Sequence, residues 1–258
     1  MASIPSEGLH LGLGMVSVGR TWGVNNAPPP SADMATALIA TAFQLGIKVF
    51  DTAPAYASSE ARLGHALDSL PHDQRLGLTV MTKMGEHWSD DTHEPFVDHG
   101  LDMLKRSIDR SLSLLGRIDL LQIHKTTAAV LGHTDTAAAI DYARSCGIAQ
   151  FGASVTSLEV GRLALETGLY AALQFPFNLV SRDMQPLLHD MAKRGTVPII
   201  NRPFAMGNLV VGAMDPVCAA EEAFGFLQDR VKNGVILTGT ANQSHLRSNI
   251  DTFRRIVA

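Results

Sequence analysis

Short runs of β-branched and apolar residues alternate along the chain with longer stretches whose apolar residues recur every three or four positions. The short runs predict strands, and the longer stretches predict amphipathic helices. The expected strands lie at 9–18, 47–52, 76–83, 118–125, 148–155, 171–177, 196–203 and 234–240. The expected helices lie at 32–45, 59–69, 98–115, 135–145, 157–167, 182–194, 216–232 and 242–256.

This alternation predicts one α/β domain over residues 1–258. Eight strand-helix units in 258 residues leave about 32 residues per unit, which favours a closed (β/α)8 barrel (a TIM barrel) with short loops and no C-terminal tail. The rival is a doubly wound dinucleotide fold, whose first turn carries G-x-G-x-x-G. Residues 12–17 read "GLGMVS", with serine in place of the third glycine, so the rival is not favoured.

Composition narrows the classes of partner and the cellular setting. The chain is 46% hydrophobic and 18% charged, carries a net charge of −4 and has no cluster of lysine and arginine. These values argue against nucleic acid or an anionic membrane as a partner. The sequence has no apolar stretch of bilayer-spanning length and no signal-peptide pattern, so a cytoplasmic protein is expected. Cys146 and Cys218 stand far apart and are expected to be buried thiols rather than metal ligands.

Four ionisable residues fall where barrel strands two to four end, and a barrel places its site at the carboxyl ends of its strands. Asp51 ends the second strand and Tyr56 follows in its loop, Lys83 ends the third strand, and His124 ends the fourth. Each has a purely structural explanation when taken alone, as a cap, loop packing, a solvated cation or a core histidine. Together, on consecutive strands and at the same end, they indicate a catalytic site.

The chemistry available to these four groups is narrow. No second carboxylate is expected on this rim and no cluster has metal-ligand spacing, which argues against carboxylate-pair hydrolysis and against a metal site. A Lys83 ammonium is expected to lower the pKa of Tyr56, making its phenol a usable proton donor. Asp51 would orient Lys83, and His124 would hydrogen-bond the oxygen that receives the proton. No serine or cysteine nucleophile is apparent, so the expected attacking group is a hydride from a cofactor.

Several separated motifs resemble those of the aldo-keto reductases. "FDTAPAYASSEARLG" (50–64) is similar to the family's D-T-A-x-x-Y-G-x-S-E-x-x-L-G signature, with Ala57 in place of glycine. "VMTK" (80–83) and "IDLLQIHK" (118–125) resemble its lysine and histidine strands, and "ILTGTANQSHLRSNI" (236–250) resembles its cofactor segment. The resemblance implies a catalytic tetrad of Asp51, Tyr56, Lys83 and His124. It also implies cofactor contacts from Ser154, Gln174, Arg202, Gly239, Thr240, Asn242, His245 and Asn249.

Departures from the family pattern concern the nucleotide and the substrate. Val155 follows Ser154 where the family often has asparagine, and Asn201 stands where many members carry an aromatic that stacks on the nicotinamide. His245 occupies a position where NADPH-preferring members often have arginine. The resemblance still implies NADPH, with NADH possible and a modest margin between them. The substrate pocket is expected to be open, walled by Trp22, His87 and Trp88.

The resulting hypothesis is a monomeric or weakly associating enzyme that reversibly reduces a small aldehyde or ketone with NAD(P)H. The alternatives are a nucleotide-binding regulatory subunit of the same fold with little turnover and, less favoured, a metal-dependent barrel hydrolase. Loss of turnover on tetrad substitution distinguishes the enzyme from the regulatory subunit, and sensitivity to a chelator identifies the hydrolase.

Overall fold

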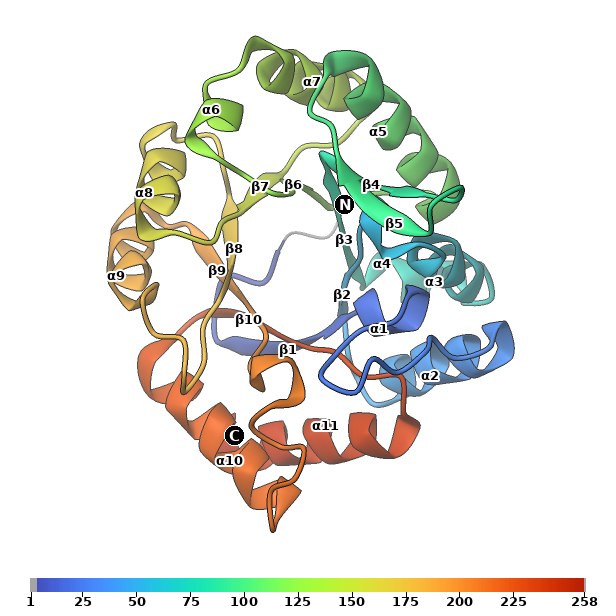
Figure 1. The fold of residues 1–258 in the computed structure, drawn as a ribbon, viewed down its shortest axis with the longest axis vertical. Helices are drawn as coiled ribbons and strands as arrows, with labels where there is room; N and C mark the ends of the chain where they lie inside the picture. The colour runs from blue at the N-terminus through green and yellow to red at the C-terminus, as the bar shows by residue number, and fades with distance from the viewer. Residues whose placement is uncertain (1–3, 258) are drawn as a thin grey trace.

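A ring of parallel strands forms the centre of the computed structural model, which describes residues 4–257 (Figure 1). Eight strands of the described chain close into a barrel in which each pairs with its neighbours, so the predicted (β/α)8 fold is confirmed. Around the ring they are β1 (Leu9–Gly14), β2 (Val49–Asp51), β3 (Thr79–Met84), β6 (Leu120–Ile123), β7 (Phe151–Ser154), β8 (Ala172–Pro176), β9 (Val197–Asn201) and β10 (Gly234–Thr238).

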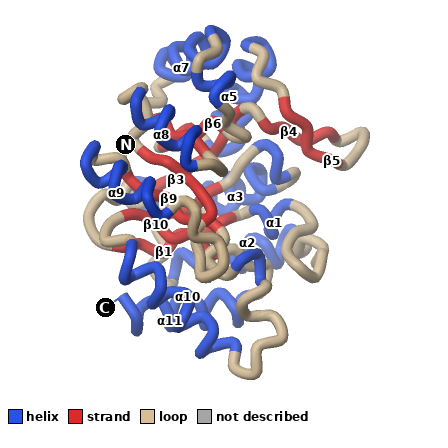
Figure 2. Tube along the Cα trace, turned by 60° about the vertical axis from the view of Figure 1, so that its left-hand side comes forward, coloured by secondary structure: helices blue, strands red, loops and turns tan. Residues whose placement is uncertain are grey.

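Helices surround the barrel and bury their apolar faces against its outer surface (Figures 1 and 2). They are α1 (Val16–Gly19), α2 (Ala32–Gln44), α3 (Ser59–Asp68), α4 (His72–Leu76), α5 (Leu101–Leu115), α6 (Ala128–Leu131), α7 (Thr134–Ser145), α8 (Leu158–Glu166), α9 (Gln185–Arg194), α10 (Pro216–Arg230) and α11 (Gln243–Val257). Two short 3₁₀ turns are η1 (Pro54–Tyr56) and η2 (Ala205–Gly207). Within residues 4–257, none of these helices has both the length and the apolarity needed to cross a membrane.

An antiparallel hairpin after β3 was not expected from the sequence. It consists of β4 (Glu86–Ser89) and β5 (Glu94–Val97), and it projects from the barrel in Figure 2. Gly85 makes the turn into it with φ of 102°, and a Cβ at this position would collide with the ring of His99. Only glycine adopts this conformation without strain, so the chain can leave β3 sharply and return over the end of the barrel.

The barrel interior is apolar toward the amino ends of the strands and polar toward their carboxyl ends. Ile4 and apolar side chains from the barrel strands form a separate hydrophobic cluster, which comprises Val49, Met81, Leu120, Ala172, Val197, Ile199, Val235 and Leu237. Above them, toward the carboxyl ends of the strands, the buried side chains include Asp51, Lys83, Gln122 and Gln174. Burial of such groups requires that they bond to one another, which makes this layer the candidate site.

Two local expectations are corrected by the structure. The first strand ends at Gly14, because the residues predicted to continue it to position 18 fold into α1. Both cysteines are exposed rather than buried. Cys146 caps the end of α7, and Cys218 lies in the first turn of α10, where its thiol donates to Asp215 Oδ2 at 3.2 Å.

Candidate active site

Asp51 is the centre of a buried hydrogen-bond network that spans the barrel. Lys83 Nζ donates to Asp51 Oδ2 at 2.7 Å and to the Thr52 carbonyl oxygen at 2.9 Å. Gln122 Nε2 donates to Asp51 Oδ1 at 2.9 Å, and Gln174 Nε2 donates to Asp51 Oδ2 at 3.1 Å. The carboxylate from β2 is therefore bonded to side chains from β3, β6 and β8, which compensates for burying its charge.

This network keeps Lys83 charged. Burial lowers the pKa of Lys83, but the charge of Asp51, the phenolate form of Tyr56 and hydrogen bonds to both residues outweigh burial, and the net pKa is raised. Lys83 is thus a fixed ammonium at the end of β3.

Tyr56 reaches this ammonium from the turn η1, directly after β2. Lys83 Nζ lies 5.0 Å from the centroid of the Tyr56 ring, and the His124 ring meets the Tyr56 ring edge-on at 5.9 Å between centroids. Ala57, the next residue, has φ of 52°, which explains why the family signature has glycine there. The sequence motif therefore encodes the turn that aims the phenol as well as the phenol itself.

The direction expected for the pKa of Tyr56 is wrong. Burial raises this pKa above its usual value near 10, and the charge and hydrogen bond of Lys83, which lower it, do not outweigh burial. The Tyr56 phenol therefore holds its proton throughout the neutral range, while Lys83 stands ready to stabilise the phenolate once that proton is given away.

The expectation that no second carboxylate shares the rim is also wrong. Glu86, the first residue of β4, is buried, and its Oε2 lies 3.0 Å from His124 Nδ1, although the two are not aligned for a hydrogen bond. Its Oε1 lies 3.4 Å from Lys125 Nζ. Sequence reasoning missed Glu86 because only the turn at Gly85 returns it to the barrel, and no pattern in "MGEHWSDD" fixes where that turn points.

His124, directly after β6, is neutral. Burial is the main cause that holds its pKa well below the usual range, and the charges of Lys83, Lys125 and Arg20 act in the same direction. A neutral imidazole offers one donor and one acceptor nitrogen to a bound oxygen.

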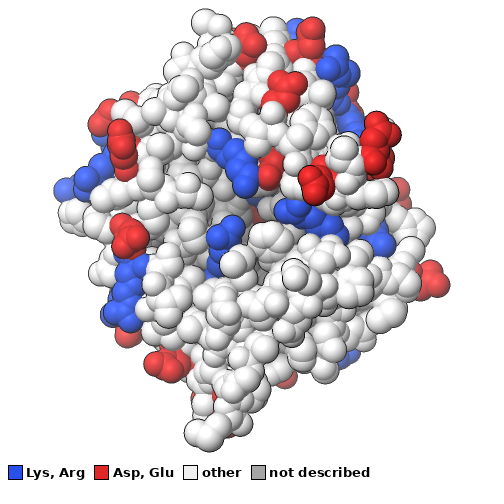
Figure 3. Space-filling model, viewed as in Figure 1, with Lys and Arg blue, Asp and Glu red and all other residues white. Residues whose placement is uncertain are grey.

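Positive charge borders the hollow at the centre of this face, where blue side chains stand around the opening in Figure 3. Lys125, directly after His124, has a side chain that is about half exposed, and the Arg202 guanidinium lies 5.9 Å from the Trp22 ring centroid. The Arg20 guanidinium lies 5.4 Å from the Trp22 ring centroid and 5.8 Å from that of Trp88. The structure thus brings together two of the expected pocket residues, Trp22 and Trp88.

His87, the third expected pocket residue, is engaged in holding the hairpin together. Its ring packs against Phe96 on β5 at 5.4 Å between centroids, and its Nε2 lies 2.9 Å from the Asp98 carbonyl oxygen. Burial lowers the pKa of His87.

The residues expected to contact the nicotinamide lie at the carboxyl ends of adjacent strands. Ser154 on β7 is in register with Gln174 on β8, and Pro176 on β8 is in register with Asn201 on β9. Gln174 Oε1 and Asn201 Oδ1 are buried without a hydrogen-bond partner in the described chain. Two unpaired acceptors at adjacent strand ends suit a carboxamide, whose amino group needs acceptors, so these residues fit a nicotinamide.

The residues expected at the adenosine end surround the start of α11. Gly239 and His245 are exposed, and Asn242 Oδ1 accepts from the backbone amides of Ser244 and His245 at 2.8 and 3.2 Å. Thr240 Oγ1 accepts from the Asn242 amide at 3.0 Å, and Asn249 Nδ2 donates to Thr238 Oγ1 at 3.0 Å. Arg202 is exposed with φ of 55°.

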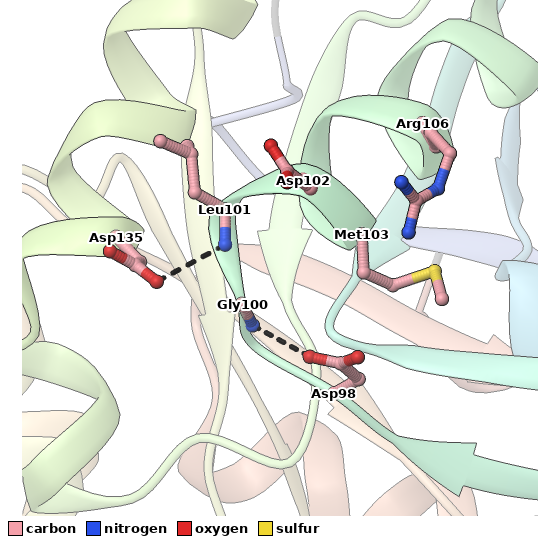
Figure 4. Close-up of a pocket in the computed structure, with 7 residues that line it drawn as sticks. All are labelled: Asp98, Gly100, Leu101, Asp102, Met103, Arg106 and Asp135. Carbon is pink, nitrogen blue, oxygen red and sulfur yellow. Dashed lines mark hydrogen bonds between the residues drawn. The ribbon is translucent and has the colours of Figure 1, made fainter.

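A hollow of about 290 Å³ at the start of α5 lies apart from this network (Figure 4). Asp98, Asp102 and Asp135 line it, and two of them already accept from the amides of Gly100 and Leu101 at 2.7 and 3.2 Å. Its acids repel anions and already occupy the helix amides. In the part of the chain that the structure describes, no group of His, Cys, Asp and Glu is arranged to hold a metal ion.

The model of the aldo/keto reductase family matches residues 10–217, which is most of the chain. This range includes Asp51, Tyr56, Lys83 and His124. The chain belongs to the aldo/keto reductase family. As a member it is an oxidoreductase, and the resemblance drawn from the sequence motifs is confirmed.

This aldo/keto reductase also resembles individual relatives and solved structures. It is 35% identical over 118 residues to L-galactose dehydrogenase of Arabidopsis thaliana, a stretch covering 44% of this chain and only 33% of that protein. The PA4992 protein of Pseudomonas aeruginosa is 27% identical with a TM-score of 0.79 over 96% of this chain and 90% of its own. A Klebsiella pneumoniae aldo-keto reductase solved with NADPH has a TM-score of 0.75 over 100% of this chain and 92% of its own. Its identity of 17% makes it evidence for the fold alone.

Proposed function

We propose that this aldo/keto reductase reversibly reduces an aldehyde or ketone to the alcohol, taking a hydride from NADPH, or less readily NADH, and a proton from Tyr56. The observation that carries the proposal is the placement of a protonated phenol beside a buried ammonium, with the Lys83 Nζ 5.0 Å from the Tyr56 ring centroid. The choice of NADPH follows the family resemblance of residues 236–250, and the unpaired acceptors of Gln174 and Asn201 fit its nicotinamide.

The proposed division of labour follows from the charges of the site. Bound NAD(P)H would supply the hydride that forms the new C–H bond. Tyr56 donates its proton to the carbonyl oxygen as that oxygen gains charge, and Lys83 stabilises the phenolate left behind. Asp51 holds Lys83 in place and charged, and neutral His124 hydrogen-bonds the same oxygen. One hydride and one proton convert the carbonyl to an alcohol, so the reaction balances.

The nucleotide contacts are assigned on the fit described above. The side-chain oxygens of Gln174 and Asn201, with Ser154 beside Gln174, would hold the carboxamide of the nicotinamide. Asn201 would not stack on the ring. Gly239, Thr240, Asn242, His245 and Asn249 would surround the adenosine end, and Arg202 is a further cofactor contact.

The test is Tyr56→Phe, which removes only the proton donor. The variant should lose about 10²- to 10⁴-fold in kcat for aldehyde reduction, because general acid catalysis is typically worth that much. Its dissociation constant for NADPH should stay within about twofold of the wild type. Turnover is followed by the absorbance of the reduced nicotinamide with a panel of aromatic and aliphatic aldehydes.

Other outcomes contradict the proposal in distinguishable ways. Unchanged turnover in Tyr56→Phe removes this phenol from the mechanism. Tight nucleotide binding by the wild type without turnover of any aldehyde or ketone, in either direction, favours the regulatory subunit.

A further inference from the structure

Arg20 is a cation beside the reacting phenol that the proposed mechanism does not use. Its guanidinium lies 5.8 Å from the Tyr56 ring centroid and is flanked by the rings of Trp22 and Trp88. Aromatic rings at these distances stabilise the charge of a guanidinium, but they do not accept hydrogen bonds from its N–H groups, which still need acceptors.

Those N–H groups are not satisfied within the protein. Arg20 Nε is buried and has no hydrogen-bond partner in the described residues. No carboxylate of residues 4–257 lies within salt-bridge distance of Arg20, and the nearby Glu86 is directed at His124 and Lys125 instead. Arg20 as a whole is only partly buried, so its terminal N–H groups, not Nε, are the edge that a ligand from outside can reach. A guanidinium at the site mouth with no carboxylate partner therefore points to an anionic partner that arrives from outside.

The position of Arg20 is fixed relative to Tyr56. A Cβ on the preceding residue, Gly19, would collide with the Tyr56 carbonyl oxygen, so the end of α1 is wedged directly against the turn η1. Ser58 Oγ donates to the Gly19 carbonyl oxygen at 3.2 Å, and Arg62 donates to the Val18 carbonyl oxygen. These contacts fix the backbone before Arg20, and the rings of Trp22 and Trp88 flank its guanidinium, so little ordering is needed when a ligand group binds, which favours affinity.

The charge of Arg20 also reaches the reacting groups, since it contributes to the low pKa of His124. An anionic group bound by Arg20 would therefore lie close to the carbonyl held by Tyr56 and His124. A guanidinium pairs with a carboxylate through two parallel N–H···O bonds, a geometry that lysine cannot reproduce.

We propose that Arg20 binds a carboxylate on the substrate, so that this enzyme favours aldehydes or ketones that carry a carboxylate over neutral ones. The inference rests on the proposed carbonyl reduction and names the substrate class of the same site. It also gives Trp22 and Trp88 a role, as the aromatic walls that hold the guanidinium.

The test compares para-carboxybenzaldehyde with its methyl ester, which has a similar shape but no charge. In the wild type, KM for the acid should be at least about tenfold lower than for the ester, as expected for a charged hydrogen-bonded pair. Arg20→Gln should raise KM for the acid by about tenfold or more while leaving KM for the ester and the Kd for NADPH within about twofold. Arg20→Lys should fall between the two, because it keeps the charge and loses the paired geometry.

Arg162→Gln is the matched control, since Arg162 is a half-exposed arginine on α8 paired with Asp190. It should leave the ratio of the two KM values unchanged. Equal KM values for acid and ester in the wild type overturn the inference. So does an equal loss for both substrates in Arg20→Gln, which indicates a structural role, or a raised Kd for NADPH, which assigns Arg20 to the cofactor.

Failure of the proposed function gives a different pattern, because neither aldehyde is then reduced by the wild type. Calorimetric binding of para-carboxybenzyl alcohol to the complex with NADP⁺ still decides the role of Arg20 in that case. Binding by the wild type that is lost in Arg20→Gln supports the carboxylate site, and equal binding or none by both proteins overturns it.

Discussion

The residues that carry the chemistry differ in how far the sequence alone identified them. Asp51 and Lys83 were predicted as a pair because their strands are adjacent, and the 2.7 Å contact confirms that pairing. Glu86 and Arg20 were missed, because Glu86 follows the turn at Gly85 and Arg20 follows the short helix α1, and the direction of each segment depends on packing with distant residues. The net pKa of Tyr56 was also misjudged, since the sequence shows a neighbouring charge but does not show the extent of burial.

The neutral state of buried His124 predicts a pH-dependent stability. Its folded-state pKa lies well below the ordinary value of 6.5, so above that value neither state holds the proton. Below it the unfolded chain binds a proton that the folded protein does not, and stability falls as the pH falls. Between about pH 7.5 and pH 5.5 the wild type should lose about 1 kcal/mol more than His124→Gln.

Urea unfolding at the two pH values measures this difference. His65→Gln, which changes an exposed histidine on α3, is the control and should retain the pH dependence of the wild type. An identical pH dependence in His124→Gln and the wild type contradicts a neutral, buried imidazole.

At the scale of whole elements, hydrophobic periodicity predicted the eight barrel strands and the eight main helices in their correct order. The same periodicity did not predict elements that are held by contacts with residues distant in the sequence. The hairpin of β4 and β5 is polar, contains Pro95 and is held by the contact of His87 with Phe96, so its sequence has neither a helical nor a strong strand pattern. The same holds for α1, a single turn packed against η1.

The start of α11 makes a prediction about the choice of nucleotide. Asn242 already occupies two backbone amides of its first turn, which leaves fewer free donors for a phosphate and gives more weight to the exposed side chain of His245. An exposed histidine can hydrogen-bond the 2′-phosphate that distinguishes NADPH from NADH, so His245→Ala should reduce the preference for NADPH.

Dissociation constants of the wild type and the variant for both nucleotides test this expectation. Arg247→Ala, two positions further along the helix and also exposed, is the control and should keep the preference of the wild type. A preference that His245→Ala leaves unchanged shows that His245 does not contact the 2′-phosphate.

At the scale of the whole molecule, neighbouring barrel strands pack so closely beside the Asp51 network that there is no room for a side chain at Gly152. A Cβ on Gly152 of β7 would lie 2.9 Å from the Ala172 carbonyl oxygen and 3.1 Å from Gln122 Cγ, whose amide bonds Asp51. Gly152→Ala should therefore lower the free energy of unfolding by about 1–3 kcal/mol and reduce kcat by displacing Gln122.

Gly225→Ala is the matched substitution outside the barrel. A Cβ at Gly225, in the interior of α10, has no atom within 4 Å, so the variant should be more stable than the wild type by about 0.5–1 kcal/mol. Urea unfolding of both variants compares the sites, and a stabilised or fully active Gly152→Ala variant contradicts the packing argument.

The network around Asp51 joins side chains that lie as far apart in the chain as 123 residues, the separation of Asp51 from Gln174. A polypeptide cut in the connection between α6 and α7 would carry Asp51, Lys83 and Gln122 on one fragment and Gln174 on the other. Neither fragment alone contains all of these hydrogen bonds, so turnover would return only when the two fragments associate and complete the barrel. With each fragment fused to a different protein, the enzyme would then act as a split reporter. The loss of absorbance of the reduced nicotinamide would show that the two fused proteins had bound each other.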